Sequence, residues 1–468
     1  MSRRVRNASR VVRDPVVLFL TLFLLGDSGG APARADNAFP SSQSVLLPRD
    51  RPQEIVVGTT FGLVSTEDGG ATWTYVCESL QATLSGRQYR MGPPPDRLFA
   101  VSDLGAPVSD DGGCTWSLPT GALASLLVLD VWPDPSLPER AFVLALDPED
   151  QVVSAYRSSD GGKSYQGPIF VAPADVTITG IESAASNPDV VYMTAQNRAD
   201  AHPWLLRSDD AGDTWTTTDI ESSVGTVVPR LVAVDAIDPN QVVLLLLGNT
   251  ADTKEFQALA MTTDAGASWW TPLMLPQGTL SGFARLPDGT MLAVGSVPDP
   301  GAPDAGAPSP VAALFRSEDA GRTFVSQAVS FHAVGLAQRD GIVYAATDDY
   351  RDGFALATSI DGGRRWTPRL RFRDIAAVKP CVRAACQQDC DYQAGIKLFP
   401  PETCNPPVAD ASTDRPQKAN GGGGGGCGCG VPGHRASSAA ALLPFLSLLF
   451  LRRRAGRRNS RRAVQDRL

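Results

Sequence analysis

Histidine is scarce in this chain of 468 residues, which has only three: His202, His332 and His434. Histidine is the side chain most often used as a general base at neutral pH and the commonest protein metal ligand. Three histidines therefore offer few possibilities for a histidine-based catalytic triad or metal site. We expect neither a metal site nor a cofactor.

Positive charge is also scarce away from the two ends. The net charge is −8 overall, but residues 1–35 contribute +4 and residues 452–468 contribute +7, so residues 36–451 carry −19. A strongly acidic middle repels phosphate backbones and anionic lipid headgroups. We therefore expect no nucleic-acid partner.

No apolar run at the N-terminus is long enough to span a bilayer by itself. Five arginines within residues 1–14 precede an apolar stretch at residues 15–25, and Ala33-Arg34-Ala35 offers small residues for a signal peptidase. This order predicts a secretory signal peptide over residues 1–35. An N-terminal membrane anchor is the alternative, disfavoured by the short run.

The C-terminal end has three consecutive parts. Six glycines at 421–426 lead to Cys427 and Cys429, residues 436–451 are apolar apart from three serines, and seven arginines follow between 452 and 462. This arrangement resembles the myxobacterial MYXO-CTERM sorting signal. The resemblance implies processing by a protease of the sorting system near Cys427 or Cys429, and delivery to the cell surface. A plain tail anchor, with residues 431–468 as transmembrane segment and arginine-rich tail, is the alternative.

One octapeptide pattern occurs seven times, as in residues 208–215 (SDDAGDTW). It resembles the Asp-box, or BNR repeat, and its aspartates lie 43, 49, 50, 54, 55 and 42 residues apart: Asp68, Asp111, Asp160, Asp210, Asp264, Asp319 and Asp361. Repeats of this period are typical of propeller blades. We predict an all-β, seven-bladed β-propeller of four-stranded antiparallel blades over residues 40–375.

The chemistry of the box is that of a turn. Its carboxylate can accept hydrogen bonds from backbone N–H groups, and the glycine two residues after the aspartate can adopt a positive φ. A calcium-binding loop is the more specific alternative. Most boxes, however, offer only one or two carboxylates, which are too few oxygen ligands for Ca²⁺. We therefore assign all seven aspartates a structural role.

Strand order assigns the loops to two faces. Turns between strands 1 and 2 share a face with the boxes, and loops between strands 2 and 3 lie on the other face, called here the loop face. Its longer polar loops are residues 147–151, 196–202, 248–255, 297–310 and 348–352. Binding residues are commonest on such loops. Our candidates are Asp147, Glu149, Asp150, Arg198, His202, Asp252, Asp348, Asp349, Tyr350 and Asp352.

Four cysteines cluster after the last box, in a small Cys-rich extension over residues 376–404: Cys381, Cys386, Cys390 and Cys404. In an exported protein they predict two disulfides with three possible pairings. A zinc site is the alternative, without paired C-x-x-C spacing to support it. Cys77 and Cys114 are expected to bridge blades 1 and 2. Residues 405–430 form a Pro- and Gly-rich linker to the predicted terminal hydrophobic helix.

Asp-box propellers include sialidases, xyloglucan-active glycoside hydrolases, the sortilin ectodomain and the photosystem II assembly factors. Seven boxes argue against the six-bladed sialidases, and seven blades fit the assembly factors better. Two hypotheses remain. The first, which we favour, is an exported, non-catalytic module that binds protein or glycan at the cell surface or outer membrane. The second is a surface glycoside hydrolase with paired loop carboxylates.

Overall fold

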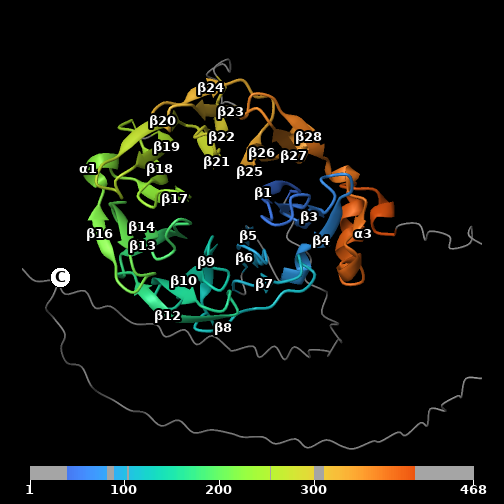
Figure 1. The fold of residues 1–468 in the computed structure, drawn as a ribbon, viewed down its shortest axis with the longest axis horizontal. Helices are drawn as coiled ribbons and strands as arrows, with labels where there is room; N and C mark the ends of the chain where they lie inside the picture. The colour runs from blue at the N-terminus through green and yellow to red at the C-terminus, as the bar shows by residue number, and fades with distance from the viewer. Residues whose placement is uncertain (1–38, 82–88, 103–104, 253, 300–309, 406–468) are drawn as a thin grey trace, which may run out of the picture. The chain divides into compact units, whose positions relative to one another are not determined.

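Seven antiparallel sheets surround a central axis in the computed structural model (Figure 1). The model describes residues 39–81, 89–102, 105–252, 254–299 and 310–405. The predicted all-β, seven-bladed propeller is confirmed. Each blade has its first strand at the axis and its last strand at the rim, so the loops alternate between two faces as expected.

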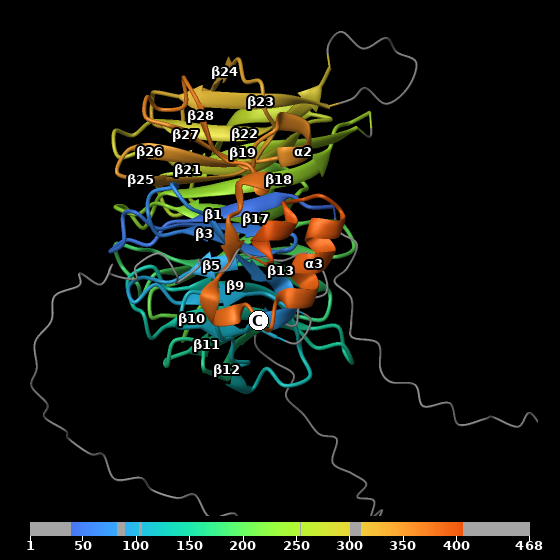
Figure 2. The same ribbon diagram turned by 90° about the vertical axis from the view of Figure 1, so that its right-hand side faces the viewer.

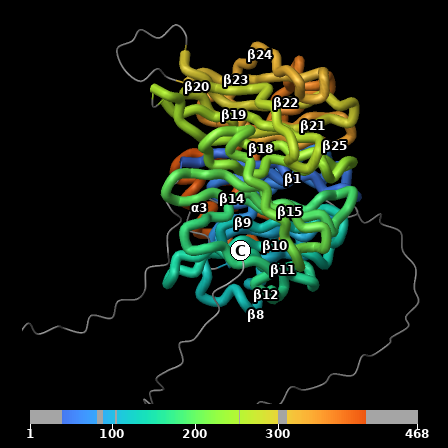
Figure 3. The backbone as a smooth tube through the Cα atoms, turned by 90° about the vertical axis from the view of Figure 1, so that its left-hand side faces the viewer, coloured from blue at the N-terminus to red at the C-terminus, as the bar shows by residue number. Residues whose placement is uncertain are grey.

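Blades 4 to 7 share one plan of four antiparallel strands, seen edge-on in Figure 3. Blade 4 contains β13 (Val176–Ser183), β14 (Val191–Asn197), β15 (Pro203–Ser208) and β16 (Thr216–Asp219). Blade 5 contains β17 (Val228–Val234), β18 (Val242–Asn249), β19 (Glu255–Thr262) and β20 (Trp270–Pro276). Blade 6 contains β21 (Thr279–Arg285), β22 (Met291–Pro298), β23 (Pro310–Ser317) and β24 (Val325–Gln327). Blade 7 contains β25 (Ala333–Arg339), β26 (Ile342–Thr347), β27 (Leu356–Ser359) and β28 (Thr367–Leu370).

Blades 1 to 3 depart from this plan. Blade 1 contains β1 (Ser42–Leu46), β2 (Ile55–Thr59), β3 (Gly62–Thr66) and β4 (Thr74–Cys77), and a fifth strand, β29 (Ala377–Val378), joins β4 in parallel. Blade 3 contains β9 (Leu127–Pro133), β10 (Ala141–Leu146), β11 (Val153–Ser158) and β12 (Ser164–Val171), with β8 (Thr120–Gly121) parallel to β12. Both edge additions are only two residues long, too short for any sequence pattern.

Blade 2 is the smallest sheet of the ring. It contains β5 (Tyr89–Met91), β6 (Leu98–Ala100) and β7 (Val108–Ser109), and Ser117 adds one isolated bridge to Val108. Pro119 follows two residues later and has no N–H group to extend that ladder. The chain instead moves to the edge of blade 3 as β8.

Short helices occupy the loop face and the C-terminal extension. They are η1 (Glu78–Gln81), α1 (Glu221–Val224), α2 (Asp349–Asp352), η2 (Phe372–Asp374), η3 (Pro380–Val382), α3 (Gln387–Gly395) and η4 (Pro401–Thr403). Figure 2 shows α3 on the outside of the ring beside the first blade. Among the described residues, no helix has the length and apolar character needed to cross a membrane.

Arginines on the third strands of blades 3, 4 and 6 form hydrogen bonds to the next blade. Arg157 donates to the carbonyl of Ala211 at 2.8 Å, Arg207 donates to the Asn240 side chain at 2.8 Å, and Arg316 donates to the carbonyl of Gly362. Each bond joins one blade to the box or first turn of its neighbour. Charged donors on backbone carbonyls are among the stronger protein hydrogen bonds.

The ring closes between blade 7 and blade 1, at a boundary called here the seam. Strands β1 to β4 come from the N-terminal end and strands β25 to β28 from the C-terminal end, and only β29, at the outer edge of blade 1, brings the C-terminal end into the first blade among the described residues. Arg339 at the end of β25 donates to the carbonyls of Pro48 and Glu54 at 2.9 and 3.0 Å, and to Pro52 at 2.6 Å. With the Arg51 carbonyl at 3.5 Å, four backbone acceptors, three of them within 3.0 Å, meet this one side chain at the junction of the two blades.

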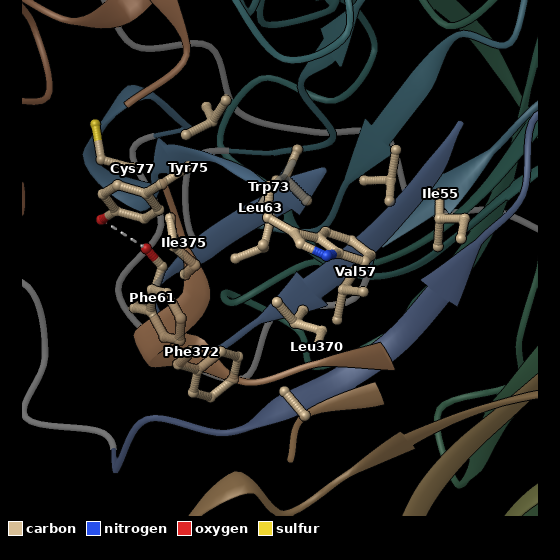
Figure 4. Packing of buried hydrophobic residues seen from close by; sticks show 14 of the residues in the cluster. Ile55, Val57, Phe61, Leu63, Trp73, Tyr75, Cys77, Leu370, Phe372 and Ile375 are labelled. Atoms are coloured by element: carbon tan, nitrogen blue, oxygen red, sulfur yellow. Dashed lines mark hydrogen bonds between the residues drawn. The ribbon is translucent and has the colours of Figure 1, made fainter. Parts of the chain in front are cut away.

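The C-terminal extension adds an apolar contact across the seam (Figure 4). Phe372 of η2 packs edge-on against Phe61 in the β2–β3 turn, with ring centroids 4.9 Å apart. Phe61 in turn accepts a hydrogen bond from the Tyr75 hydroxyl through its carbonyl, at 3.1 Å. The side chains of Ile375 and Val378 belong to the same buried cluster. The extension is therefore part of the hydrophobic core of blade 1.

The predicted disulfide arrangement is wrong in two respects. Cys77 bonds to Cys386 and Cys114 bonds to Cys381, so the expected bridge between Cys77 and Cys114 does not form. Cys77 ends β4 and Cys114 lies in the second box, and each is bonded to a cysteine of the C-terminal extension, which leaves neither thiol for a bridge between them. Only Cys390 and Cys404 pair within the extension. The two long-range disulfides attach the extension to blades 1 and 2.

Several predictions concern residues outside the described ranges. These are the signal peptide over 1–35, the linker, Cys427 and Cys429, the segment 431–468, and most of the loop 297–310. They stay predictions.

Candidate functional site

The seven box aspartates all accept hydrogen bonds within their own turns, and six of them also accept one from a serine or threonine hydroxyl four residues later, where Asp361 has Arg365. In the fourth box, Asp210 accepts bonds from the Ser208 hydroxyl at 2.7 Å, the Thr214 N–H at 2.8 Å and the Thr214 hydroxyl at 2.6 Å. These hydrogen bonds, from Thr214 above all, lower the pKa of Asp210 to about 2. Corresponding bonds to the serine or threonine that opens the box recur at Asp68, Asp111, Asp160, Asp264, Asp319 and Asp361.

Two of the candidate loops lie beside one another at the junction of blades 3 and 4. Arg198 donates to the carbonyl of Gln151 and, through Nε, to the Thr177 hydroxyl at 2.8 Å. In the neighbouring loop, Asp147 and Asp150 accept bonds from the backbone N–H groups of residues 149 and 152. These aspartates shape their own turn, and the Glu149 side chain is exposed.

His202 lies between two carboxylates at the edge of blade 4. Its Nε2 is 3.0 Å from Asp219 and its Nδ1 is 3.1 Å from Glu221. The ring also packs on Trp204, with centroids 4.8 Å apart. Because the two acids lie on opposite sides of the imidazole, they hold the ring in place and do not converge on a shared ligand.

Asp252 makes its contacts within its own loop in blade 5. It accepts a bond from the Thr250 hydroxyl at 2.5 Å and lies 3.5 Å from the Lys254 ammonium. The structure therefore distributes the first six candidates over separate contacts and does not gather them into one site.

The loop at residues 348–352 behaves differently. Asp348 caps α2 by accepting bonds from the N–H groups of Tyr350 and Arg351, and Asp352 accepts bonds from the His332 N–H at 2.8 Å and ring Nδ1 at 3.0 Å. Asp348 and Asp352 thus fix the loop. Asp349 and Tyr350, which lie between these two residues in the sequence, line a pocket.

This pocket lies on the loop face at the seam and is called here the seam pocket. Its volume is about 530 Å³. Three segments far apart in the sequence line it: the β2–β3 turn with the chain entering blade 1, the α2 loop of blade 7, and the C-terminal extension. The lining residues with exposed or polar side chains are Phe39, Thr60, Glu78, Asp349, Tyr350, Arg373, Tyr392, Gln393, Ile396 and Lys397.

Apolar side chains form the rim of the seam pocket. Tyr350, Phe39 and Tyr392 are 78, 58 and 48 % exposed. The rings of Phe39 and Tyr350 meet edge to face, with centroids 4.9 Å apart. Aromatic rings open to solvent around a cavity are the usual anchors of a binding site.

The interior of the seam pocket is polar, and two of its buried acceptor atoms lack hydrogen-bond partners. Gln393 on α3 is only 5 % exposed, yet its Oε1 has no hydrogen-bond partner. Oδ1 of Asp349 has none either. Burial raises the pKa of Asp349, against the opposing effects of the Phe372 N–H and the charge of Arg373. Leaving a buried acceptor unpaired is costly, so both atoms point to a bound donor.

Sequence reasoning missed most of this site. Glu78, Arg373, Tyr392, Gln393 and Lys397 were not among the candidates. The correct disulfide pairing would have indicated them, because Cys77 precedes Glu78 and Cys386 is seven residues before Gln393. Spacing alone does not specify pairing.

The central channel is a second cavity, of about 440 Å³, lined by the inner strands of all seven blades. Arg90 of blade 2 and Glu182 of blade 4 line its polar side, and Asp130 of blade 3 is buried. Burial raises the pKa of Glu182 to about 7, with Arg90 opposing and Asp130 reinforcing the shift. Burial likewise raises the pKa of Asp130. Across the described ranges, no group of three or more His, Cys, Asp or Glu residues is placed to hold a metal ion.

Comparison with known proteins gives likeness in solved structures alone. No family model matches the chain, and no curated protein does. YCF48 from Cyanidioschyzon merolae is similar at 12 % identity and a TM-score of 0.43, over 68 % of this chain and 94 % of that one. Sqt1 from Saccharomyces cerevisiae matches at 8 % identity and a TM-score of 0.44, over 71 % and 86 %.

A xyloglucanase of the GH74 type from Xanthomonas campestris matches at 12 % identity and a TM-score of 0.36. That match covers 75 % of this chain and 61 % of the enzyme, so this chain spans less than two thirds of the enzyme's length. Likeness at this level carries no information about ligand or activity.

Proposed function

We propose that this chain is an exported, surface-displayed recognition module that holds its ligand in the seam pocket without catalysis. One observation carries the proposal. The pocket combines a solvent-exposed aromatic rim with buried acceptors that lack partners in the folded chain. A protein or glycan ligand would supply both the apolar contact and the missing donors.

Export is supported by the state of the cysteines. All six cysteines in the described residues are in disulfides, and two of these attach the extension that forms the pocket. Structural disulfides are formed and kept in oxidising compartments. Together with the sequence of the two ends, this favours secretion through the signal peptide. Retention at the cell surface or outer membrane, anchored or processed at its C-terminus, follows from the proposed sorting signal.

A glycoside hydrolase is the second candidate, and one observation favours it. Glu78 and Asp349 both line the seam pocket, and the pKa of Asp349 is raised by burial, as a general acid requires. Arg373 and Lys397 line the same pocket. These two acidic and two basic residues together also suit the binding of a ligand without turnover.

Both candidates are tested by presenting the full chain on cells to purified polysaccharides and secreted proteins, while reducing ends are measured. We expect binding with no reducing-end release, and loss of binding in Tyr350→Ala/Tyr392→Ala. Met274→Ala, which shortens an exposed apolar side chain on β20, is the matched control. Reducing-end release that disappears in Asp349→Asn would make the chain an enzyme. Retained binding in the double variant would move the site elsewhere.

A further inference from the structure

The charges and hydrogen-bonding needs of the seam pocket specify what kind of ligand fits. Two acidic residues, Glu78 and Asp349, and two basic ones, Arg373 and Lys397, line the pocket. A balanced set of charges gives no net attraction for a cation or an anion. The ligand that such a pocket favours is neutral.

The unpartnered atoms add a second requirement. Oδ1 of Asp349 accepts only, so it needs a donor. The Gln393 amide needs a partner at its buried end, whichever of its two terminal atoms lies there. A hydroxyl group meets both needs, because it can donate and accept.

The rim adds a third requirement. Tyr350 and Tyr392 expose their rings at the mouth of the pocket, beside the exposed aliphatic side chain of Ile396. Such surfaces pack against a flat, weakly polar face with C–H groups. The ligand therefore has hydroxyl groups at its edge and an apolar face.

We propose that the seam pocket binds a neutral sugar residue, with its ring against Tyr350 or Tyr392 and its hydroxyls on Asp349 and Gln393. This assignment rests on the proposed recognition function and names its ligand class. The volume of about 530 Å³ has room for one or two sugar rings and for no larger folded ligand.

The test is saturation-transfer NMR on the full chain in detergent micelles, with glucose, galactose, mannose, xylose and cellobiose as probes. At least one probe should receive saturation, and its binding should weaken about tenfold or more in Gln393→Leu and in Tyr350→Ala. Gln393→Leu removes an unsatisfied amide, so its melting temperature should not fall, which separates lost contact from lost folding. Met274→Ala should bind as the wild type does.

The source of the sugar is resolved by a second arm. Binding of a neutral polysaccharide is compared with binding of a glycoprotein before and after enzymatic removal of its glycans. Loss of binding after deglycosylation would support a glycoprotein glycan, and binding of the polysaccharide alone would support a free polymer. Saturation of none of the five sugars, with protein binding retained on cells, would overturn the sugar assignment and leave the recognition function standing. Absence of all binding would overturn both.

Discussion

Blades 4 to 7 repeat one plan, whereas blades 1 to 3 and the extension depart from it. The regular blades each have four antiparallel strands. The irregular part has two parallel edge strands, a shortened blade and all three disulfides. The seam pocket lies where the irregular part meets blade 7. The regular repeats form the scaffold, and the departures from them form the candidate site.

The two sides of the central channel also differ, along another division of the blades. Arg90 of blade 2 and Glu182 of blade 4 line one side, while blades 5 to 7 contribute mainly leucines and Phe283 to the lining. Buried ionisable groups reduce stability unless they are paired. The comparison predicts that stability changes most where the ring is irregular.

The largest effect should come from the two long-range disulfides that attach the extension. Removing both, with Cys77→Ser/Cys386→Ser and Cys114→Ser/Cys381→Ser, opens covalent loops of sequence separation 309 and 267, against 14 for the pair Cys390 and Cys404. We expect a loss of about 2–5 kcal/mol in the free energy of unfolding, measured by denaturant titration. Cys390→Ser/Cys404→Ser is the control and should lose less. Equal losses would show that the extension does not contribute to ring closure.

The second effect is pH-dependent and concerns Glu182. Its pKa is raised to about 7 in the folded protein from 4.5, so the folded state binds the proton more tightly. Stability should be full below pH 4.5, fall as the pH rises towards 7 and stay low above it. Glu182→Gln should remove this decline and stabilise the protein at pH 8 by about 3 kcal/mol at most. Thermal unfolding of the wild type and of Glu182→Gln between pH 4 and 8 measures this pH dependence. Parallel curves of stability against pH for the two proteins would contradict the assignment to Glu182.

The third effect compares two inter-blade arginines. Arg339 at the seam donates to three carbonyls within 3.0 Å, whereas Arg157 between blades 3 and 4 donates to one and pairs with exposed Asp213. Arg339→Met should cost about 1–3 kcal/mol in the free energy of unfolding, and Arg157→Met about 1 kcal/mol or less. Denaturant titration ranks them. The reverse order would place the weakest junction of the ring elsewhere.

The smallest effect should come from a single box. Asp210→Ala removes three hydrogen bonds from one exposed turn and should lower the melting temperature by about 2–3 °C. Because the pKa of Asp210 is lowered to about 2 from 3.8, its contribution is present above pH 3.8 and lost as the pH falls towards 2. The difference from the wild type should vanish over that window. A difference that persists at pH 2 would mean that the side chain acts other than through its charge.

The sequence predicted what repeats and missed what does not. Seven boxes specify seven blades, and the strand order correctly assigns loops such as residues 196–202 to the connection between a second and a third strand. The parallel strands β8 and β29 escape prediction because a two-residue strand has no periodicity. The seam pocket escapes it because its lining comes from residues near 39–78, 349–353 and 372–398. Asp349 and Tyr350 were found only because polar loops on a rigid scaffold are good candidates.

The central claim is that ligand recognition belongs to the seam. Hydrogen–deuterium exchange on the full chain, with and without the sugar that receives most saturation, tests it directly. The account predicts protection at residues 60–61, 349–353 and 392–398, and no change in the loops of blades 3 to 5. Protection confined to residues 147–151 and 196–202, with the seam unchanged, would contradict it.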